Sequence, residues 1–193
     1  MGLSQALGLT LVIGLVVIVA GLIFVGLATY NDVVALGQRI DKAWANIGVA
    51  LKQRYDELPN LVAAVRGEMG FEAEVLEEVT RLRAAYAPAA AVSDQATTSE
   101  ATTHAVRLLL ADVERYPALK AQANVAALQA EIARLEDILA ARRELYNEMV
   151  YRYDTRIAQL PALPLAGVLG WRARPYFAAD PAAAVPPEAR LTA

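Results

Sequence analysis

Acidic side chains gather in one short stretch, and paired carboxylates are the groups in this sequence best suited to chemistry. Five glutamates occupy the stretch: Glu68, Glu72, Glu74, Glu77 and Glu78. Facing carboxylates can act as general acid and base or hold two metal ions. A di-metal site in a helical bundle, however, uses Glu-x-x-His pairs, and no histidine occurs in this half of the chain. We therefore interpret the cluster as a solvated acidic helix face.

Other reactive side chains are scarce. The chain has no cysteine, which excludes disulfides, thiol nucleophiles and cysteine-based zinc or iron–sulfur sites. Its one histidine, His104, lies one turn from Leu108 and is expected on a helix surface rather than as a ligand or base. No nucleophile–base pair, phosphate loop or metal cluster is visible. The sequence thus predicts a protein that is not an enzyme and that has no catalytic residue, metal or cofactor.

The composition indicates the fold class and excludes one class of partner. The net charge is −3, and no basic patch with interleaved aromatics appears, so no nucleic-acid partner is expected. Outside the N-terminal run the chain is rich in alanine and poor in glycine, and no segment has the alternating pattern of strands. We predict an all-α fold in which an N-terminal transmembrane helix continues into a long antiparallel helical hairpin or bundle.

The N-terminal run is an expected membrane anchor covering residues 1–29. Leu7 to Ala28 contains no charge and, as a helix, is about 33 Å long, which is enough to cross the hydrocarbon core. A cleaved signal peptide is the competing interpretation, but no Lys or Arg precedes Arg39 and the apolar core is too long. The glycines in the run are either simply tolerated in lipid or support packing between spans: Gly8, Gly14, Gly21 and Gly26.

Orientation is encoded by a small charge bias. The C-terminal flank of the run carries Arg39 and Lys42, then Lys52 and Arg54, against two aspartates. The positive-inside rule then predicts a single-pass protein of the bacterial inner membrane with its large domain in the cytoplasm. An extracytoplasmic domain is the alternative.

An apolar stripe at helical spacing follows the anchor and predicts one nearly straight helix with a single face to cover. Pro59 interrupts it, but the stripe stays in phase, so we interpret Pro59 as a kink in a helix that continues to Tyr86, rather than as a corner. We predict that the following residues form a packing and assembly stripe: Leu36, Ile40, Trp44, Ile47, Leu51, Tyr55, Leu58, Val62 and Val65.

A second helical arm is expected to return beside the first. Residues 87–97 form a predicted loop, and Thr97 with Glu100 forms a capping box that starts the next helix. Pro117 is a second kink candidate, and a heptad-like coiled-coil pattern begins at Val125. Arg142 lies on that seam, either buried against a carboxylate or, as we favour, extending outward.

Two such arms, 30–86 and 98–160, bury only one seam. They must either fold further into a four-helix bundle or meet copies of themselves, so we expect a homo-oligomer.

The segment 161–177 is expected to lie beside the membrane, completing a domain of residues 30–177. It mixes apolar and basic residues, which suits an interfacial segment, although a hydrophobic cap on the end of the bundle is equally compatible. The membrane-interface candidates are Tyr30, Leu165, Leu169, Trp171, Arg172 and Arg174. Residues 178–193 are rich in Pro and Ala, and a disordered tail is expected there.

Several motifs resemble the LemA family of bacterial membrane proteins. They occur in the same order along residues 29–178: the Tyr30–Asn31 pair, AWANIGVALKQRYDELPNLV from Ala43, LEEVTRLRA from Leu76, ERYPALKA from Glu114, ARRELYN from Ala141, YDT from Tyr153, the LPAL–GW region and RARPYF. The resemblance implies one N-terminal anchor, a helical-bundle domain and no established catalytic activity. A family member associated with magnetosomes is linked to membrane formation, and relatives are often encoded beside membrane metalloproteases.

The sequence departs from the family at two places. Some relatives are lipoproteins with a cysteine just before the Tyr-Asn pair, where this chain has Ala28-Thr29, so no lipid anchor is expected. Asp154 stands where the family often has asparagine. Together these features predict a membrane-anchored, non-enzymatic scaffold that binds the lipid bilayer, self-associates and organises or shapes the membrane. The alternative is an adaptor of a membrane protease or an envelope-stress system.

Overall fold

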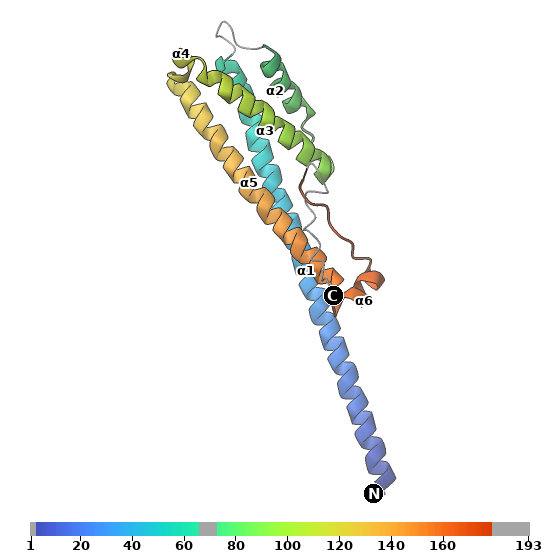
Figure 1. Cartoon of the computed structure of the whole chain (residues 1–193). Helices are drawn as coiled ribbons and strands as arrows, with labels where there is room; N and C mark the ends of the chain where they lie inside the picture. Colours follow the sequence, from blue (N-terminus) through green and yellow to red (C-terminus); the bar gives the residue numbers. More distant parts are fainter. Residues whose placement is uncertain (1–2, 66–72, 179–193) are drawn as a thin grey trace, which may run out of the picture. The chain divides into compact units, whose positions relative to one another are not determined.

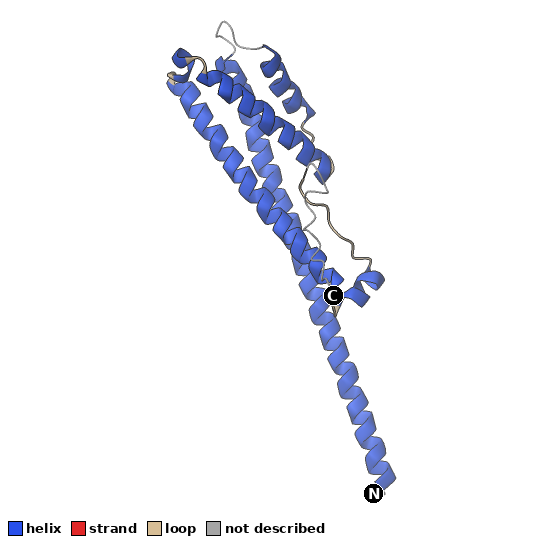
Figure 2. Cartoon of the chain, in the orientation of Figure 1, coloured by secondary structure: helices blue, strands red, loops and turns tan. Residues whose placement is uncertain are grey.

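A computed structural model describes residues 3–65 and 73–178, and every regular element in these ranges is helical (Figures 1 and 2). In order, the helices are α1 Leu3–Val65, α2 Ala73–Ala85, α3 Val92–Glu114, α4 Pro117–Lys120, α5 Ala123–Ala158 and α6 Ala162–Leu169. The predicted all-α fold is confirmed. The predicted disordered tail lies, beyond Ala178, outside the described residues.

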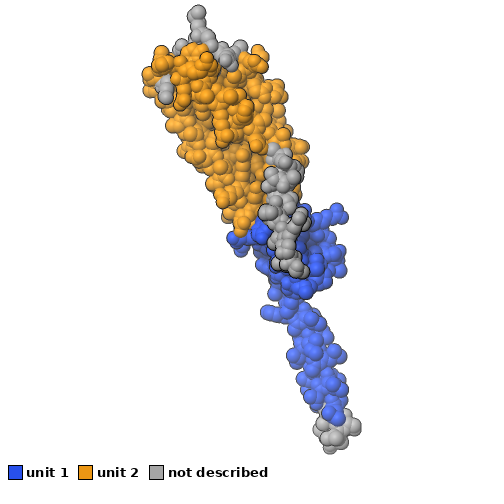
Figure 3. Space-filling model, in the orientation of Figure 1, with its two compact units in different colours: residues 1–41, 149–174 blue, residues 42–148, 175–193 orange. Residues whose placement is uncertain are grey.

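The chain divides into two compact units (Figure 3). The first unit contains residues 1–41 and 149–174, and the second contains residues 42–148 and 175–193. The border falls inside α1 and inside α5, so each of these helices contributes residues to both units. The predicted boundary between anchor and domain after residue 29 stays a prediction.

In the second unit the chain reverses direction between α1 and α2. The rings of Tyr55 and Tyr86 stack with centroids 4.3 Å apart, whereas one continuous helix would separate these residues by about 46 Å. A single helix running to Tyr86 is therefore wrong, although α1 does continue through Pro59 to Val65 as predicted. The connection between the two helices, residues 66–72, lies outside the described residues. Folding back lets α2 cover apolar surface of α1 that a straight arm would leave exposed.

The third helix begins earlier than its predicted capping box. α3 starts at Val92, so Thr97 lies inside the helix, and its hydroxyl donates to the carbonyl oxygen of Ser93 at 3.0 Å. Gln95 explains the early start, because its buried side-chain amide donates to the carbonyl oxygens of Pro88 and Ala90 at 3.0 and 3.1 Å. The turn before the helix is thus held by an amide that the sequence pattern did not single out.

Pro117 makes a corner rather than a kink. α3 ends at Glu114, the four-residue helix α4 begins at Pro117 itself, and α5 starts at Ala123. A proline is well tolerated at a first helical position, because the missing N–H has no partner there and the fixed φ suits a helix. α5 then runs to Ala158, close to the predicted end at Leu160.

In the first unit, α1 supplies the one helix among the described residues that is long and apolar enough to cross a membrane. None of the residues in its most apolar window is buried, unlike the residues of a core helix in a soluble protein. Farther along α1, the carboxylate of Asp32 pairs with the Nε of Arg156 on α5 at 2.6 Å. This ion pair joins the last turns of α5 to α1 just after the apolar run.

Candidate functional site

A fully buried arginine is the centre of the polar interior of the second unit. The side chain of Arg54 has no exposed surface, and its Nε lies 2.6 Å from Oε1 of Glu136 on α5. The contact is a charge pair rather than a linear hydrogen bond. The terminal nitrogens of Arg54 donate to the Ser99 carbonyl oxygen at 3.1 Å and to the Thr103 hydroxyl at 3.0 Å, both on α3. One side chain thus connects α1, α3 and α5.

A second arginine shares the same partners. Arg143 on α5 donates to the hydroxyl of Ser99, and its guanidinium lies 5.0 Å from the ring centroid of Phe177. Glu136 in turn accepts a hydrogen bond from Thr103 at 3.0 Å. Burial lowers the pKa of both arginines, and the attraction of Glu136 opposes that lowering. Both cations are thus attracted by Glu136, and Arg143 is attracted by Glu100 as well.

Tyrosines complete the polar interior. The hydroxyls of Tyr55 and Thr102 lie 3.0 Å apart, and burial raises the pKa of Tyr55 above its ordinary value. Tyr55 therefore stays protonated at neutral pH and serves as a hydrogen-bonding group. Because Arg54 is fully buried and Tyr55 is nearly so, a dissolved substrate cannot reach them. The arrangement braces three helices against one another.

The predicted acidic face agrees with the structure where the structure describes it. Glu74 and Glu77 are exposed on α2, and Glu78 pairs with Arg81 at 2.6 Å, whereas Glu68 and Glu72 lie outside the described residues. Among the described residues, no group of three or more acidic or histidine side chains is placed to hold a metal ion. His104 is exposed, as predicted.

The predicted packing and assembly stripe is covered within a single copy of the chain. Leu36 and Trp44 are half-buried, and Trp44 packs against the rings of Tyr146 and Phe177 at centroid distances of 5.7 and 6.1 Å. The other members are buried: Ile40, Ile47, Leu51, Tyr55, Leu58, Val62 and Val65. A role of this stripe in assembly stays a prediction.

Sequence reasoning missed the arginine cluster, although a signal was present. Arg54 falls between Leu51 and Leu58 at the spacing of the buried face, and a charge at such a position indicates an interior partner. The seam of α5 runs through Leu139, Arg143 and Tyr146. Arg142 is exposed, in agreement with the favoured prediction that it extends outward. Arg143 occupies the position on the seam that the sequence pattern assigned to Arg142.

The membrane-interface candidates lie in the first unit, and the structure brings two of them together. The rings of Tyr30 and Trp171 have centroids 6.1 Å apart. Leu165 is half-buried, whereas Leu169, Arg172 and Arg174 are exposed.

Arg174 is held in place by two contacts of its own. Its backbone N–H donates to Asp154 at 3.0 Å, and its guanidinium lies 6.0 Å from the ring centroid of Tyr153. Burial raises the pKa of Asp154, and the hydrogen bond from Arg174 opposes the rise. Arg174 therefore belongs to the packing of α5 as well as to the exposed surface.

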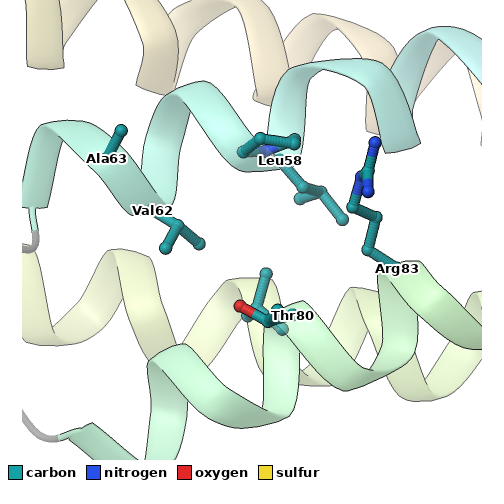
Figure 4. A pocket seen from close by; sticks show the side chains of 7 residues that line it. Leu58, Val62, Ala63, Thr80 and Arg83 are labelled. Atoms are coloured by element: carbon teal, nitrogen blue, oxygen red, sulfur yellow. The ribbon is translucent and has the colours of Figure 1, made fainter.

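The hollows on the surface of the second unit include one of about 600 Å³ between α2 and α3, lined by Glu74, Glu77, Glu78 and Arg81 among others, and two smaller ones. A cavity of about 220 Å³ lies between α1 and α2, with Leu58, Val62 and Ala63 on one side and Thr80 and Arg83 on the other (Figure 4). A wider groove of about 480 Å³ has Trp44, Val49 and Tyr86 among its lining residues. The two smaller hollows are mainly apolar, and neither collects the convergent polar groups of a catalytic site.

Comparison with known proteins assigns the chain to a family. The model of the LemA family matches residues 43–190. Two curated proteins of Paramagnetospirillum magneticum, magnetosome proteins MamQ 1 and MamQ 2, are each 31% identical to this chain over 83 residues. The match covers 43% of this chain and 30% of those proteins, so it spans less than a third of their length. The chain is a membrane-associated helical protein, and it belongs to the LemA family.

Proposed function

We propose that this protein is a non-enzymatic scaffold of the bacterial membrane, one that self-associates and organises or shapes the bilayer around it. The observation that carries the proposal is the distribution of polar and apolar groups. The strongest polar constellation, around Arg54, is sealed inside the bundle, whereas the largest run of exposed apolar side chains lies on the N-terminal part of α1. The exposed apolar surface of the chain is therefore suited to contact with lipid and with other helices.

Self-association is supported by the glycines of the apolar run. A Cβ added at Gly14 or Gly21 would meet no atom within 4 Å, so that face of α1 is open to a neighbour. The two glycines are seven residues apart and share a helix face, and small residues let transmembrane helices approach closely. The resemblance to a family with a member linked to membrane formation supports the membrane-shaping part of the proposal.

The test is the mass of the full chain in mild detergent and in lipid nanodiscs, with negative-stain images of the same samples. We expect particles of several copies, and we expect Gly14→Leu combined with Gly21→Leu to shift them toward monomer. Val16→Leu, which adds a methylene group on the opposite face of α1, is the matched control and should leave the mass unchanged. A chain that is monomeric at every concentration would contradict the scaffold.

A second candidate function is an adaptor for a membrane protease. The groove beside Trp44 favours it, because Val49 is 58% exposed and is flanked there by Lys52 and Asp56, which suits an apolar segment with polar edges. An adaptor predicts small oligomers and a co-purifying protease that is lost in Val49→Glu. Arg142→Glu, an exposed charge change on α5, is the control.

A further inference from the structure

Exposed apolar side chains gather at the last helix of the first unit. In and just before α6, Leu160 is 77% exposed, Leu163 53% and Val168 84%. No residue of α6 carries a charge. A helix this apolar and this exposed is unusual on a surface that meets only water, and such patches mark contacts with a membrane or a partner.

The patch adjoins the end of the apolar run of α1. α6 ends at Gly170, whose φ of 70° is the left-handed conformation that glycine adopts readily, and the N–H of Trp171 closes the turn on the carbonyl oxygen of Ala166 at 3.0 Å. This turn places the Trp171 ring 6.1 Å from the Tyr30 ring. Tyr30 lies two residues past Ala28, where the apolar run ends. The ring contact therefore brings the exposed apolar surface of α6 next to the end of the apolar run.

The first unit, which contains the patch, carries a net positive charge. The first unit carries five arginines and three aspartates. Of the aspartates, Asp32 is paired with Arg156, and Asp154 accepts the N–H of Arg174. Arg172 is exposed directly beside Trp171. This combination attracts anionic phosphate groups rather than a basic partner surface.

We infer that α6 and Trp171 form an interfacial foot, which lies in the same leaflet that the apolar run of α1 enters. Leu163, Val168 and Leu169 reach the acyl boundary, Tyr30 and Trp171 lie at headgroup depth, and Arg172 binds the phosphate of an anionic phospholipid. The inference rests on membrane association, one part of the proposed function, but not on self-association. There are two alternatives. A second copy of the chain covers the patch, or the patch stays in water as a cap on the end of the bundle.

The first test measures how deeply α6 lies in the membrane. Because the chain has no cysteine, a single introduced cysteine can be labelled without background. Val168→Cys and, as the matched control, Val49→Cys on the second unit are labelled with a nitroxide in the full chain, in nanodiscs that hold a single copy. We expect the label at 168 to be several-fold less accessible to a water-soluble nickel relaxer than the label at 49, and more accessible to oxygen. Equal accessibility at the two positions would overturn the inference. Protection at 168 only when several copies share a disc would overturn it too, and would identify a second copy as the occupant.

The headgroup test compares discs of phosphatidylcholine alone with discs of equal parts phosphatidylcholine and phosphatidylglycerol. Because a basic residue near an anionic surface strengthens binding about fivefold, Arg172→Gln should move the 168 label toward water in the anionic discs. The matched control is Arg142→Gln on the second unit, which should have no effect. If the accessibility of the label at 168 changed neither with lipid charge nor with Arg172→Gln, the assignment of the phosphate contact would be overturned. The oligomer mass, measured separately, shows whether self-association fails independently of the foot.

Discussion

At the residue scale, the pairing of Arg54 with Glu136 is the contact on which the second unit depends most. Arg54 has lost all contact with water, and Glu136 keeps only 26% of its side-chain exposure. A buried charge that loses its partner keeps its desolvation cost without compensation. Removing one of the two groups should therefore cost more stability than removing both charges.

Glu136→Gln is predicted to lower the free energy of unfolding by about 3 kcal/mol, the low end for a broken buried pair since Glu136 is partly exposed, because it leaves the charge of Arg54 unpaired. Adding Arg54→Met to Glu136→Gln should recover part of the loss, because it removes the unpaired charge of Arg54. Chemical unfolding of the full chain in mild detergent measures both effects. The control is Glu131→Gln, which breaks an exposed pair with Arg134 and should change nothing measurable. Equal losses at 131 and 136 would refute the pairing argument.

Phe177 is predicted to hold its own segment, residues 175–178, on the bundle of the second unit. It is 5% exposed, its N–H donates to Asn147 at 2.8 Å, and its ring contacts Trp44 and Arg143. Phe177→Ala should cost about 3 kcal/mol. In a Trp171→Phe background, Trp44 is the remaining tryptophan. There Phe177→Ala should also shift the tryptophan fluorescence emission to the red, because it exposes the Trp44 ring to water. Leu145→Ala, at a more exposed position on α5, is the comparison and should leave the emission where it is.

At the scale of elements, most helices could be predicted from apolar periodicity, but the corners could not. The apolar stripe of α1 continues in phase across Pro59. The spacing of these residues therefore predicts that the helix continues past the proline. The reversal before α2 does not, because the apolar residues of α2 fit either a continued helix or a helix folded back onto the first. The stacking of Tyr86 on Tyr55 and the cavity shared by α1 and α2 decide between them. The start of α3 was missed because it depends on Gln95, which donates to carbonyls that come close only after the turn has formed.

Pro59→Ala is predicted to raise the stability of α1 by at least about 1 kcal/mol, because the new N–H can donate to the carbonyl of Tyr55. The gain should be smaller than the ~3 kcal/mol typical of a helix interior, since the neighbouring packing has adjusted to proline. Thermal unfolding followed by circular dichroism measures the change. Asn60→Ala, one residue away and also exposed, is the control. A loss of stability in Pro59→Ala would mean that the packing of α1 requires the ring.

At the scale of the whole molecule, the charge bias of the sequence predicts that the second unit lies on the cytoplasmic side of the membrane. A cytoplasmic location predicts that Ala89→Cys, in the exposed loop after α2, escapes an impermeant maleimide on intact cells and reacts after permeabilisation. Gly2→Cys should show the reverse. Labelling of the 89 position on intact cells would place the unit outside.

The buried arginine also limits how copies of this protein can combine. If α1 slid along α3 and α5 by one turn, about 5 Å, the buried charge of Arg54 would lose its contacts with Glu136, Ser99 and Thr103. The same penalty applies when a helix of one copy tries to enter the bundle of another in a shifted register. We therefore expect the pair to fix the register of α1, so that any helix packing into a bundle, from the same copy or another, must place Arg54 against Glu136.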